Sequence, residues 1–257
     1  MAMGEEKSGS RDRVILPHPV LSTYYTQEKD RRRFMWGLFE STAKDYDWIN
    51  AMMSFGMGAS YRKDALCRYG LSEGMTVLDV AVGTGLTARG AQSVTGPFGR
   101  VIGIDPTQGM LDRARQCADI LVVRGLAEEL PVRDNTADFL TMTYALRHVR
   151  DLVVTFREYR RVLKPGGRLL LLELLCPPPN SIQYSLARLY LYWLVPWVAQ
   201  VRGGKDAKTL MRYFWDTMEQ CVPPPTILDA LAISGFVNVT HKSPFGLCGE
   251  YVANKTP

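Results

Sequence analysis

The sequence has few residues of the kinds that bind metals or form disulfides. Its 257 residues include three histidines, and no two of them have the spacing of metal ligands. The five cysteines are odd in number, lie far apart and form no CxxC motif. We therefore expect no metal site, and we expect reduced thiols in a cytoplasmic protein. Because about the first 15 residues are polar and charged, we also expect no secretory signal.

The sequence also lacks a concentration of positive charge. The formal net charge is +5, and the basic residues are scattered except for the run Arg31 to Arg33. Since no basic stripe with interleaved aromatic residues is present, we expect no nucleic-acid partner. Hydrophobic residues make up 46% of the chain and charged residues 22%, which is typical of an ordinary globular protein. This length suits one large domain with additions.

Short apolar segments alternate with helical patterns through the middle of the chain. The predicted strands are residues 76–80, 100–105, 120–124, 139–143 and 168–175. The predicted helices between them are residues 86–93, 107–118 and 152–163. Strands that are apolar along their whole length are buried on both faces, as parallel strands between helices are. With a closing antiparallel hairpin at 236–242 and 249–253, the pattern predicts an α/β fold: a Rossmann-like, doubly wound, mostly parallel seven-stranded sheet.

Segments outside this alternation predict additions to a single domain. Residues 1–16 are rich in glycine, serine and charge and are predicted to be a disordered tail, with one domain over residues 17–257. Residues 28–70 predict an N-terminal helical lid with a break around residues 54–58. Residues 181–220, which follow the proline-rich CPPPN segment, predict a helical cap insertion with Gly203-Gly204 as its hinge.

The first two predicted strands end in acidic residues and glycines. The segment VLDVAVGTG (77–85) places Asp79, Gly83 and Gly85 at a strand end, where ligands bind in open α/β sheets. The glycines allow a tight turn and a close approach to a ligand. VIGID (101–105) ends in Asp105, a position that suits the two hydroxyls of a ribose. The spacing fits NAD, FAD and S-adenosylmethionine, and a turn without a ligand is the structural alternative.

Three features favour S-adenosylmethionine among these cofactors. Ala81 stands where a dinucleotide enzyme has its first glycine, which leaves the pyrophosphate cradle incomplete. Asp79 at the loop entrance would repel a diphosphate but suits an aminoacyl sulfonium. The third feature is the segment GLAEELPVRDNTADF (125–139), which follows the third strand.

From about residue 39 to residue 253 the chain resembles a known family. It is similar to class I S-adenosylmethionine-dependent methyltransferases, nearest to the UbiE-type C-methyltransferases of ubiquinone and menaquinone biosynthesis. The resemblance rests on ESTAKDYDWINAMMSFGMGASYRKDAL (40–66), VLDVAVGTG (77–85), VIGIDPTQGMLDRAR (101–115), AEELPVRDNTADFLTMTYALRHVRD (127–151) and RVLKPGGRLLLLEL (161–174).

The resemblance implies S-adenosyl-L-methionine as cofactor, with S-adenosyl-L-homocysteine as product, and assigns a site to it. The residues implied around its methionine part are Asp79, Ala81, Gly83, Gly85 and Thr143. Those implied around its nucleoside part are Asp105 at the ribose, Met110 against the adenine and Ala127, whose backbone faces the adenine edge.

Four departures from the family pattern bear on affinity and on the substrate. Leu126 stands where the family commonly has Asp or Asn, and Leu86 where an Asp often follows the glycines. His148, in ALRH (145–148), replaces a usual Asn. The segment RYFWDTMEQCVPPPTI (212–227) is only loosely similar to its counterpart. These departures bear on the quinone substrate more than on the cofactor.

The leading hypothesis is an enzyme that methylates an aromatic or quinone-like small molecule, most simply on a ring carbon of a hydroquinone or phenol. Such a ring becomes nucleophilic when a hydroxyl loses its proton, so a base is expected. The candidate catalytic residues are Tyr46, Arg147 and His148. Arg147 would stabilise a phenolate, because a guanidinium does not accept a proton at ordinary pH. His148 has a suitable pKa, and Tyr46 would close over the cofactor or orient the substrate.

Alternatives remain open at this point. One is an O- or N-methyltransferase of a specialised metabolite on the same scaffold, and another is a cofactor-binding protein without methyl transfer. Two candidate catalytic residues also have a structural alternative: His148 as a partly buried histidine that caps a strand or helix, and Tyr46 as a packing residue. The apolar segment 182–201 is interpreted as a core or lid helix pair, with contact to a membrane surface as the alternative. A homodimer is a further alternative.

Overall fold

The computed structural model describes residues 14–257 and contains one sheet of seven strands. The strands are β1 (Thr76–Val80), β2 (Arg100–Asp105), β3 (Leu121–Arg124), β4 (Ala137–Thr143), β5 (Leu163–Leu174), β6 (Val237–Lys242) and β7 (Cys248–Asn254). Their order is β3-β2-β1-β4-β5-β7-β6. Strands β1 to β5 pair in parallel, while β7 is antiparallel to both β5 and β6. The predicted sheet and its closing hairpin are therefore confirmed.

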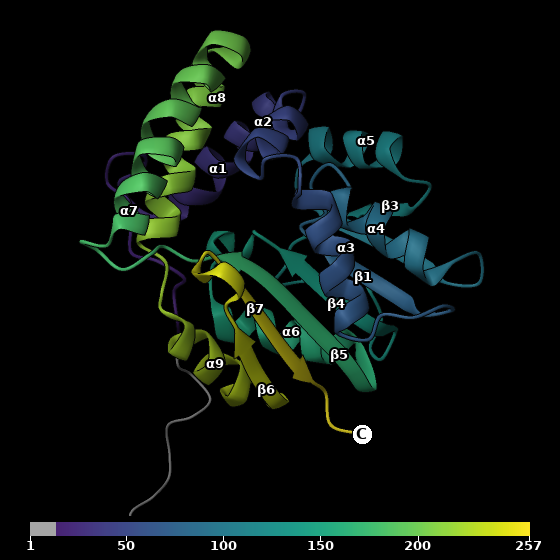
Figure 1. Cartoon of the computed structure of the whole chain (residues 1–257). Helices are drawn as coiled ribbons and strands as arrows, with labels where there is room; N and C mark the ends of the chain where they lie inside the picture. Colours follow the sequence, from purple (N-terminus) through teal and green to yellow (C-terminus); the bar gives the residue numbers. More distant parts are fainter. Residues whose placement is uncertain (1–13) are drawn as a thin grey trace, which may run out of the picture.

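Helices cover both faces and the upper end of the sheet (Figure 1). The α-helices are α1 (Glu28–Thr42), α2 (Tyr46–Met53), α3 (Gly58–Arg68), α4 (Leu86–Thr95), α5 (Gln108–Cys117), α6 (Leu152–Val162), α7 (Ile182–Ala187), α8 (Val195–Glu219) and α9 (Pro224–Ile233). Two 3-10 turns, η1 (Leu146–His148) and η3 (Pro244–Gly246), and a π-helical stretch, η2 (Arg188–Leu194), complete the elements. The order of the strands reverses between β1 and β4, and ligands bind at such a switch point.

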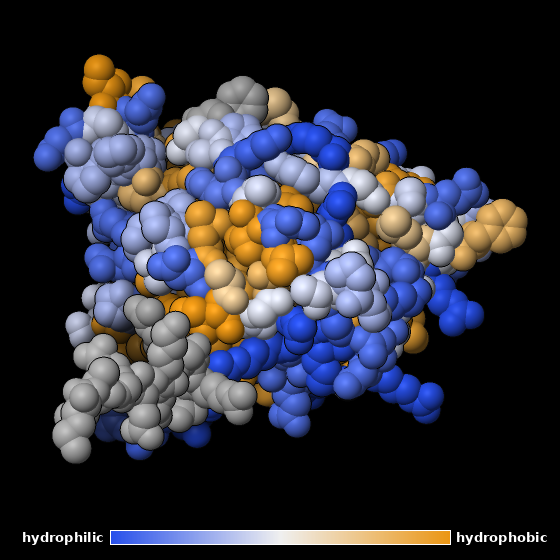
Figure 2. Space-filling model, turned by 90° about the horizontal axis from the view of Figure 1, so that it is seen from below, coloured by the Kyte–Doolittle hydropathy of each residue, from blue (hydrophilic) through white to orange (hydrophobic). Residues whose placement is uncertain are grey.

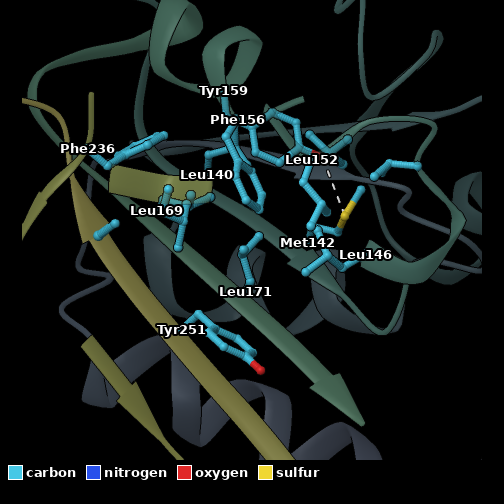
Figure 3. Close-up of a cluster of buried hydrophobic side chains, with 14 of the residues drawn as sticks. Leu140, Met142, Leu146, Leu152, Phe156, Tyr159, Leu169, Leu171, Phe236 and Tyr251 are labelled. Carbon is cyan, nitrogen blue, oxygen red and sulfur yellow. Dashed lines mark hydrogen bonds between the residues drawn. The ribbon is translucent and has the colours of Figure 1, made fainter. Parts of the chain in front are cut away.

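Alternate residues of the central strands point to opposite faces, and both faces are buried. Leu140 and Met142 of β4 belong to one apolar cluster, and Phe139 belongs to the cluster on the other face. Figure 3 shows the first cluster, in which Phe156 and Tyr159 of α6 lie over the strands. This double burial explains why the strands are apolar along their whole length. Seen from below, the surface is mostly hydrophilic, with hydrophobic residues gathered near the middle (Figure 2).

The N-terminal part differs from the prediction in two respects. The predicted disordered tail lies outside the described residues over 1–13, but Ile15 is buried in the core and accepts a hydrogen bond from Leu152 N–H. The helical region breaks twice, between α1 and α2 as well as at the predicted break between α2 and α3. Of these three helices, α1 and α2 contribute residues to the pocket at the upper end of the sheet, whereas α3 packs against α4.

The cap consists of α7, η2 and α8, which fold back on themselves at the predicted hinge. Gly204 has φ 80° and ψ −163°, a conformation that only glycine adopts readily, and it separates the two arms within α8. The second arm packs against α1 through an apolar cluster that includes Met35 and Leu210. Within residues 14–257, no helix combines the length and apolarity needed to cross a membrane.

Candidate functional site

A pocket lies at the carboxyl ends of β1, β2 and β4, beneath α1 and α2. It encloses about 800 Å³ of space without protein atoms, part of it open to solvent. The described residues that line it are Arg32, Met35, Trp36, Phe39, Tyr46, Val80, Ala81, Gly83, Asp105, Pro106, Thr107, Met110, Gly125, Leu126, Ala127, Glu128, Met142, Thr143, Tyr144, Ala145, His148 and Val149. The strand ends thus bring most of the predicted site residues together.

The loop between β1 and α4 turns through a series of left-handed residues. Ala81, Gly83 and Gly85 have φ values of 56°, 54° and 89°. A side chain at Gly83 would meet little protein, because the nearest atom would lie 4.0 Å from its Cβ, so a ligand can approach the backbone here. A side chain at Gly85 would come within 3.1 Å of Ala114 Cα. Gly85 therefore lets α5 pack closely and does not line the pocket.

Asp105 ends β2 inside the pocket, and three protein donors hold its carboxylate. Gly83 N–H donates to Oδ2 at 3.0 Å, and the N–H and hydroxyl of Thr107 donate to Oδ1 at 3.0 and 2.7 Å. Burial raises the pKa of Asp105, and these hydrogen bonds oppose the rise. Since a carboxylate has about four acceptor positions, capacity remains for a hydroxyl group in the pocket.

Asp79 is the fourth of the five residues of β1; it is fully buried and does not line the pocket. Neither of its carboxylate oxygens has a hydrogen-bond partner of good geometry among the described residues, although the Ala88 N–H lies close enough to lower the pKa of Asp79. Burial raises the pKa of Asp79 to about 8, although the positive charge of Arg62 on α3 opposes the shift. An unpartnered buried carboxylate is costly, so it indicates a group that receives a ligand.

Apolar residues form the nucleoside end of the predicted site. Met110 of α5 is buried and lines the pocket, together with Leu126 and Ala127 after β3. Leu126 provides an apolar wall at the position where the family commonly has a polar side chain. At the other end, Thr143 hydrogen bonds to Thr87 through their hydroxyl groups, 2.8 Å apart.

Ion pairs and hydrogen bonds hold the helices α1 and α2 over the pocket. Arg32 of α1 pairs with Glu128 at 3.3 Å, and both residues line the pocket. Glu40 of α1 accepts hydrogen bonds from the N–H of Gly109 at 2.9 and 3.0 Å. These polar contacts are partly exposed, so each contributes little to stability.

His148 faces the pocket from the turn after β4, between two aromatic rings. Phe39 contacts it edge-on, with ring centroids 5.3 Å apart, and Tyr213 of the cap stacks on it at 5.8 Å. Burial and the charges of Arg147 and Arg31 hold the pKa of His148 well below its usual value. The imidazole is therefore neutral at physiological pH, and its buried Nδ1 has no partner in the described chain. Tyr46 also lines the pocket, and burial raises its pKa.

Arg147, which was expected to stabilise a phenolate, does not line the pocket. Its side chain is buried behind the pocket wall, where it forms an ion pair with Glu173 at the end of β5. It also donates to the Thr217 hydroxyl at 3.1 Å and lies 4.5 Å over the Phe214 ring, both on α8. Arg147 thus joins the sheet to the cap and does not line the pocket.

Sequence reasoning missed several residues of the site. Arg62 lies buried beside Asp79, and Tyr144 lines the pocket with a φ of 58°, which is rare for a bulky residue. Arg62 shares a helical face with the buried apolar residues Ala65 and Leu66. This position in the helix could have indicated from the sequence that Arg62 is buried. The partners of Arg32 and Arg147 are distant in sequence and left no local signal.

Comparison with known proteins identifies the class and then the family. A solved S-adenosylmethionine-dependent methyltransferase from Aquifex aeolicus matches with a TM-score of 0.58 and 20% identity, over 76% of this chain and 89% of that one. This likeness shows that the chain shares the Rossmann-like fold of that protein. The model of the ubiE/COQ5 methyltransferase family matches residues 25–255, and the chain belongs to this family.

Two curated relatives support this assignment. The demethylmenaquinone methyltransferase of Symbiobacterium thermophilum is 32% identical over 228 residues, which cover 83% of this chain and 89% of that protein. The ubiquinone/menaquinone biosynthesis C-methyltransferase UbiE of Saccharophagus degradans is 30% identical over 225 residues, with 85% and 89% covered. The predicted family, fold class and enzyme class are confirmed.

The raised pKa of Asp79 gives a prediction for stability without any ligand. The carboxyl has a pKa of about 8 in the folded protein and its ordinary value of 3.8 when unfolded. Between these values the folded state holds a proton that the unfolded state lacks, so stability falls as pH rises. Relative to Asp79→Asn, the wild type should lose about 1.4 kcal/mol per pH unit between pH 5 and 7.5. Urea unfolding of both proteins measures this difference, and parallel pH profiles would contradict it.

The Arg147–Glu173 pair gives a second prediction. Glu173→Gln keeps the side-chain shape but leaves the Arg147 charge buried without its counter-charge. We expect a loss of about 3–5 kcal/mol in the free energy of unfolding, measured in urea. Asp112→Asn is the matched control, because it breaks the exposed Arg115–Asp112 pair, which should cost less than about 1 kcal/mol. Equal losses in both variants would refute the structural role of Glu173.

Proposed function

We propose that this protein transfers a methyl group from S-adenosyl-L-methionine to a ring carbon of an isoprenoid hydroquinone. Family membership supports methyl transfer, and the printed names of the curated relatives point to quinone biosynthesis. The observation that carries the proposal is the neutral His148 imidazole, which faces the same pocket as the Asp105 carboxylate. One pocket thus offers a base for a phenolic hydroxyl beside a site for a nucleoside.

The residues present fit the cofactor. Asp105 has acceptor capacity left for the ribose hydroxyls, and Met110 and Ala127 offer an apolar surface and a backbone for adenine. The unpartnered Asp79 carboxylate suits the ammonium group of the methionine part, with the open backbone at Gly83 beside it. When bound, this cofactor supplies an electrophilic methyl group on a sulfonium.

His148 is the residue we propose as the base. A neutral imidazole accepts the hydroxyl proton of a hydroquinone, which makes the ring carbons more nucleophilic. Phe39 and Tyr213 hold the imidazole plane from two sides, so the ring is oriented before the substrate arrives. The nearby Arg147 and Arg31 charges disfavour a long-lived imidazolium, so the proton is released again readily.

Arg147 and Tyr46 have other proposed roles. Arg147 is a positioning residue: its bonds to Glu173 and Thr217 fix the turn that carries His148 and the cap helix that carries Tyr213. This role replaces direct contact with a phenolate, because the guanidinium lies behind the wall. Tyr46 closes the pocket from α2 and contacts Phe39 edge-on, with ring centroids 6.1 Å apart.

A labelled-methyl assay tests the function. Purified protein is incubated with methyl-labelled S-adenosyl-L-methionine and a reduced demethylmenaquinone, and separately with polar phenols and amines. We expect label in the quinone, on carbon. His148→Gln should lower turnover by about 10²–10⁴-fold, since it removes a general base, and should leave S-adenosyl-L-homocysteine affinity unchanged.

His241→Gln is the matched control, because this histidine stacks on Tyr251 in the sheet, away from the pocket lining. It should leave turnover unchanged. Label only in polar phenols or amines would instead support an O- or N-methyltransferase. Full activity of His148→Gln would refute its role as base.

We further propose that the cap touches a membrane surface, where a lipid-tailed substrate resides. Large apolar residues follow each other at helical spacing along its outer arm and are 55–80% exposed: Ile182, Leu186, Leu189, Trp193, Trp197 and Val201. Between residues 182 and 212 the cap has five basic residues and one acidic residue. An apolar stripe flanked by positive charge is complementary to an anionic bilayer surface.

Sedimentation with vesicles of phosphatidylglycerol and phosphatidylcholine tests this contact. Trp197→Glu should weaken binding at least about tenfold, because a charge replaces an apolar anchor. Phe98→Glu is the matched control, since Phe98 is 82% exposed but lies in the turn between α4 and β2. A wild-type dimer that Trp197→Glu converts to a monomer would overturn the proposal and identify the stripe as a dimer interface.

A further inference from the structure

Arg62 is a buried cation whose surroundings contain no ion-pair partner in the described chain. It lies on α3, is 5% exposed and donates from Nη1 to its own helix, at Gly58 O, over 2.8 Å. Its guanidinium carbon lies 4.6 Å over the ring of Tyr144, which lines the pocket. Its Nε is buried and has no hydrogen-bond partner. A guanidinium has five N–H donors in a plane, and at least the one on Nε remains for a ligand.

The nearest compensating charge is Asp79, yet the two side chains do not pair. Burial raises the pKa of Asp79 and the Arg62 charge opposes the rise, but both Asp79 oxygens lack partners and no ion pair joins Asp79 to Arg62. A buried guanidinium without a counter-charge and a buried carboxyl group without hydrogen-bond partners are each costly. The arrangement is explained if a third group with both charges lies between them.

An α-amino acid is such a group, because it carries an ammonium and a carboxylate on one carbon. We propose that Arg62 binds the carboxylate of the methionine part of the cofactor, while Asp79 receives its ammonium. A planar guanidinium and a carboxylate match in geometry, and their hydrogen bonds are charge-assisted. This inference rests on the proposed cofactor and adds a residue that neither the motifs nor the pocket lining identified.

The placement of Arg62 makes the ligand a link between two parts of the fold. Asp79 belongs to the sheet, whereas Arg62 belongs to the helix that follows α1 and α2. Tyr144 supports the guanidinium from the end of β4, and its left-handed φ of 58° is a strained conformation of the kind that gathers at ligand sites. The bound amino acid would thus hold α3 against the strand ends.

Binding calorimetry with two ligands tests the proposal. The first ligand is S-adenosyl-L-homocysteine, and the second is decarboxylated S-adenosyl-L-homocysteine, which lacks only the carboxylate. Arg62→Gln should bind the first about 10–100-fold more weakly, as expected for a lost hydrogen bond to a charged group. It should bind the second as the wild type does. Arg62→Lys should recover part of the lost affinity, because it keeps the charge but not the planar fork.

Lys63→Ala is the matched control, since it removes the neighbouring cation of the same helix, which is exposed. It should leave both affinities unchanged. An equal loss for both ligands in Arg62→Gln, or no loss for either, would overturn the proposal. Thermal unfolding of Arg62→Gln without ligand shows whether an equal loss of affinity for both ligands comes from misfolding. In that case the ratio of the two affinities in Arg62→Lys tests the proposal instead.

The outcome is separable from that of the proposed function. A carboxylate-dependent loss in Arg62→Gln, together with absence of methyl transfer to any quinone, would refute the proposed substrate and support the role of Arg62. Methyl transfer to the quinone with unchanged affinities in Arg62→Gln would refute the role of Arg62 alone.

Discussion

The buried ion pair between Arg147 and Glu173 is the contact on which the geometry of the site depends. It joins the turn after β4 to the end of β5, and the same guanidinium reaches Thr217 and Phe214 on the cap. Arg31 of α1 donates to the carbonyl oxygen of Arg147 at 2.7 Å. The Arg147 guanidinium therefore connects sheet and cap, and Arg31 joins α1 to the same turn. Because removal of either charge would leave the other buried alone, these elements are constrained to keep their relative positions.

The contacts above the pocket are of a different kind. Arg32–Glu128 and Arg113–Asp47 join α1 and α2 to the rim, and both pairs are at least partly exposed. Such pairs contribute little free energy, so they can open without cost to the core. Buried contacts of Arg147 and Arg31 connect the sheet, the cap and α1, whereas the exposed Arg113–Asp47 pair holds α2 to the rim only weakly.

The sequence predicted those parts of the structure that follow from local patterns. Strand β2 begins and ends where the apolar pattern predicts, and the hinge lies at Gly204, where only glycine suits the backbone. Asp105 and Gly83 could be placed together because the carboxyl ends of neighbouring parallel strands meet at one edge. Arg147 could not be placed, since its partners Glu173 and Thr217 lie 26 and 70 residues further along the chain. Its burial is a property of the packed helices.

Buried ionisable groups that have partners stabilise the fold, whereas buried ionisable groups that lack partners are candidates for binding a ligand. Arg147 is fully buried and has an acid, a hydroxyl and an aromatic ring as partners, so its charge is satisfied within the protein. Asp79 and Arg62 are also buried, yet both carboxylate oxygens of Asp79 and the Nε of Arg62 lack partners. Burying such groups without partners lowers the stability of the fold, and the raised pKa of Asp79 reflects this loss. A zwitterionic ligand would satisfy both charges together, and its binding would recover free energy that folding alone leaves unused.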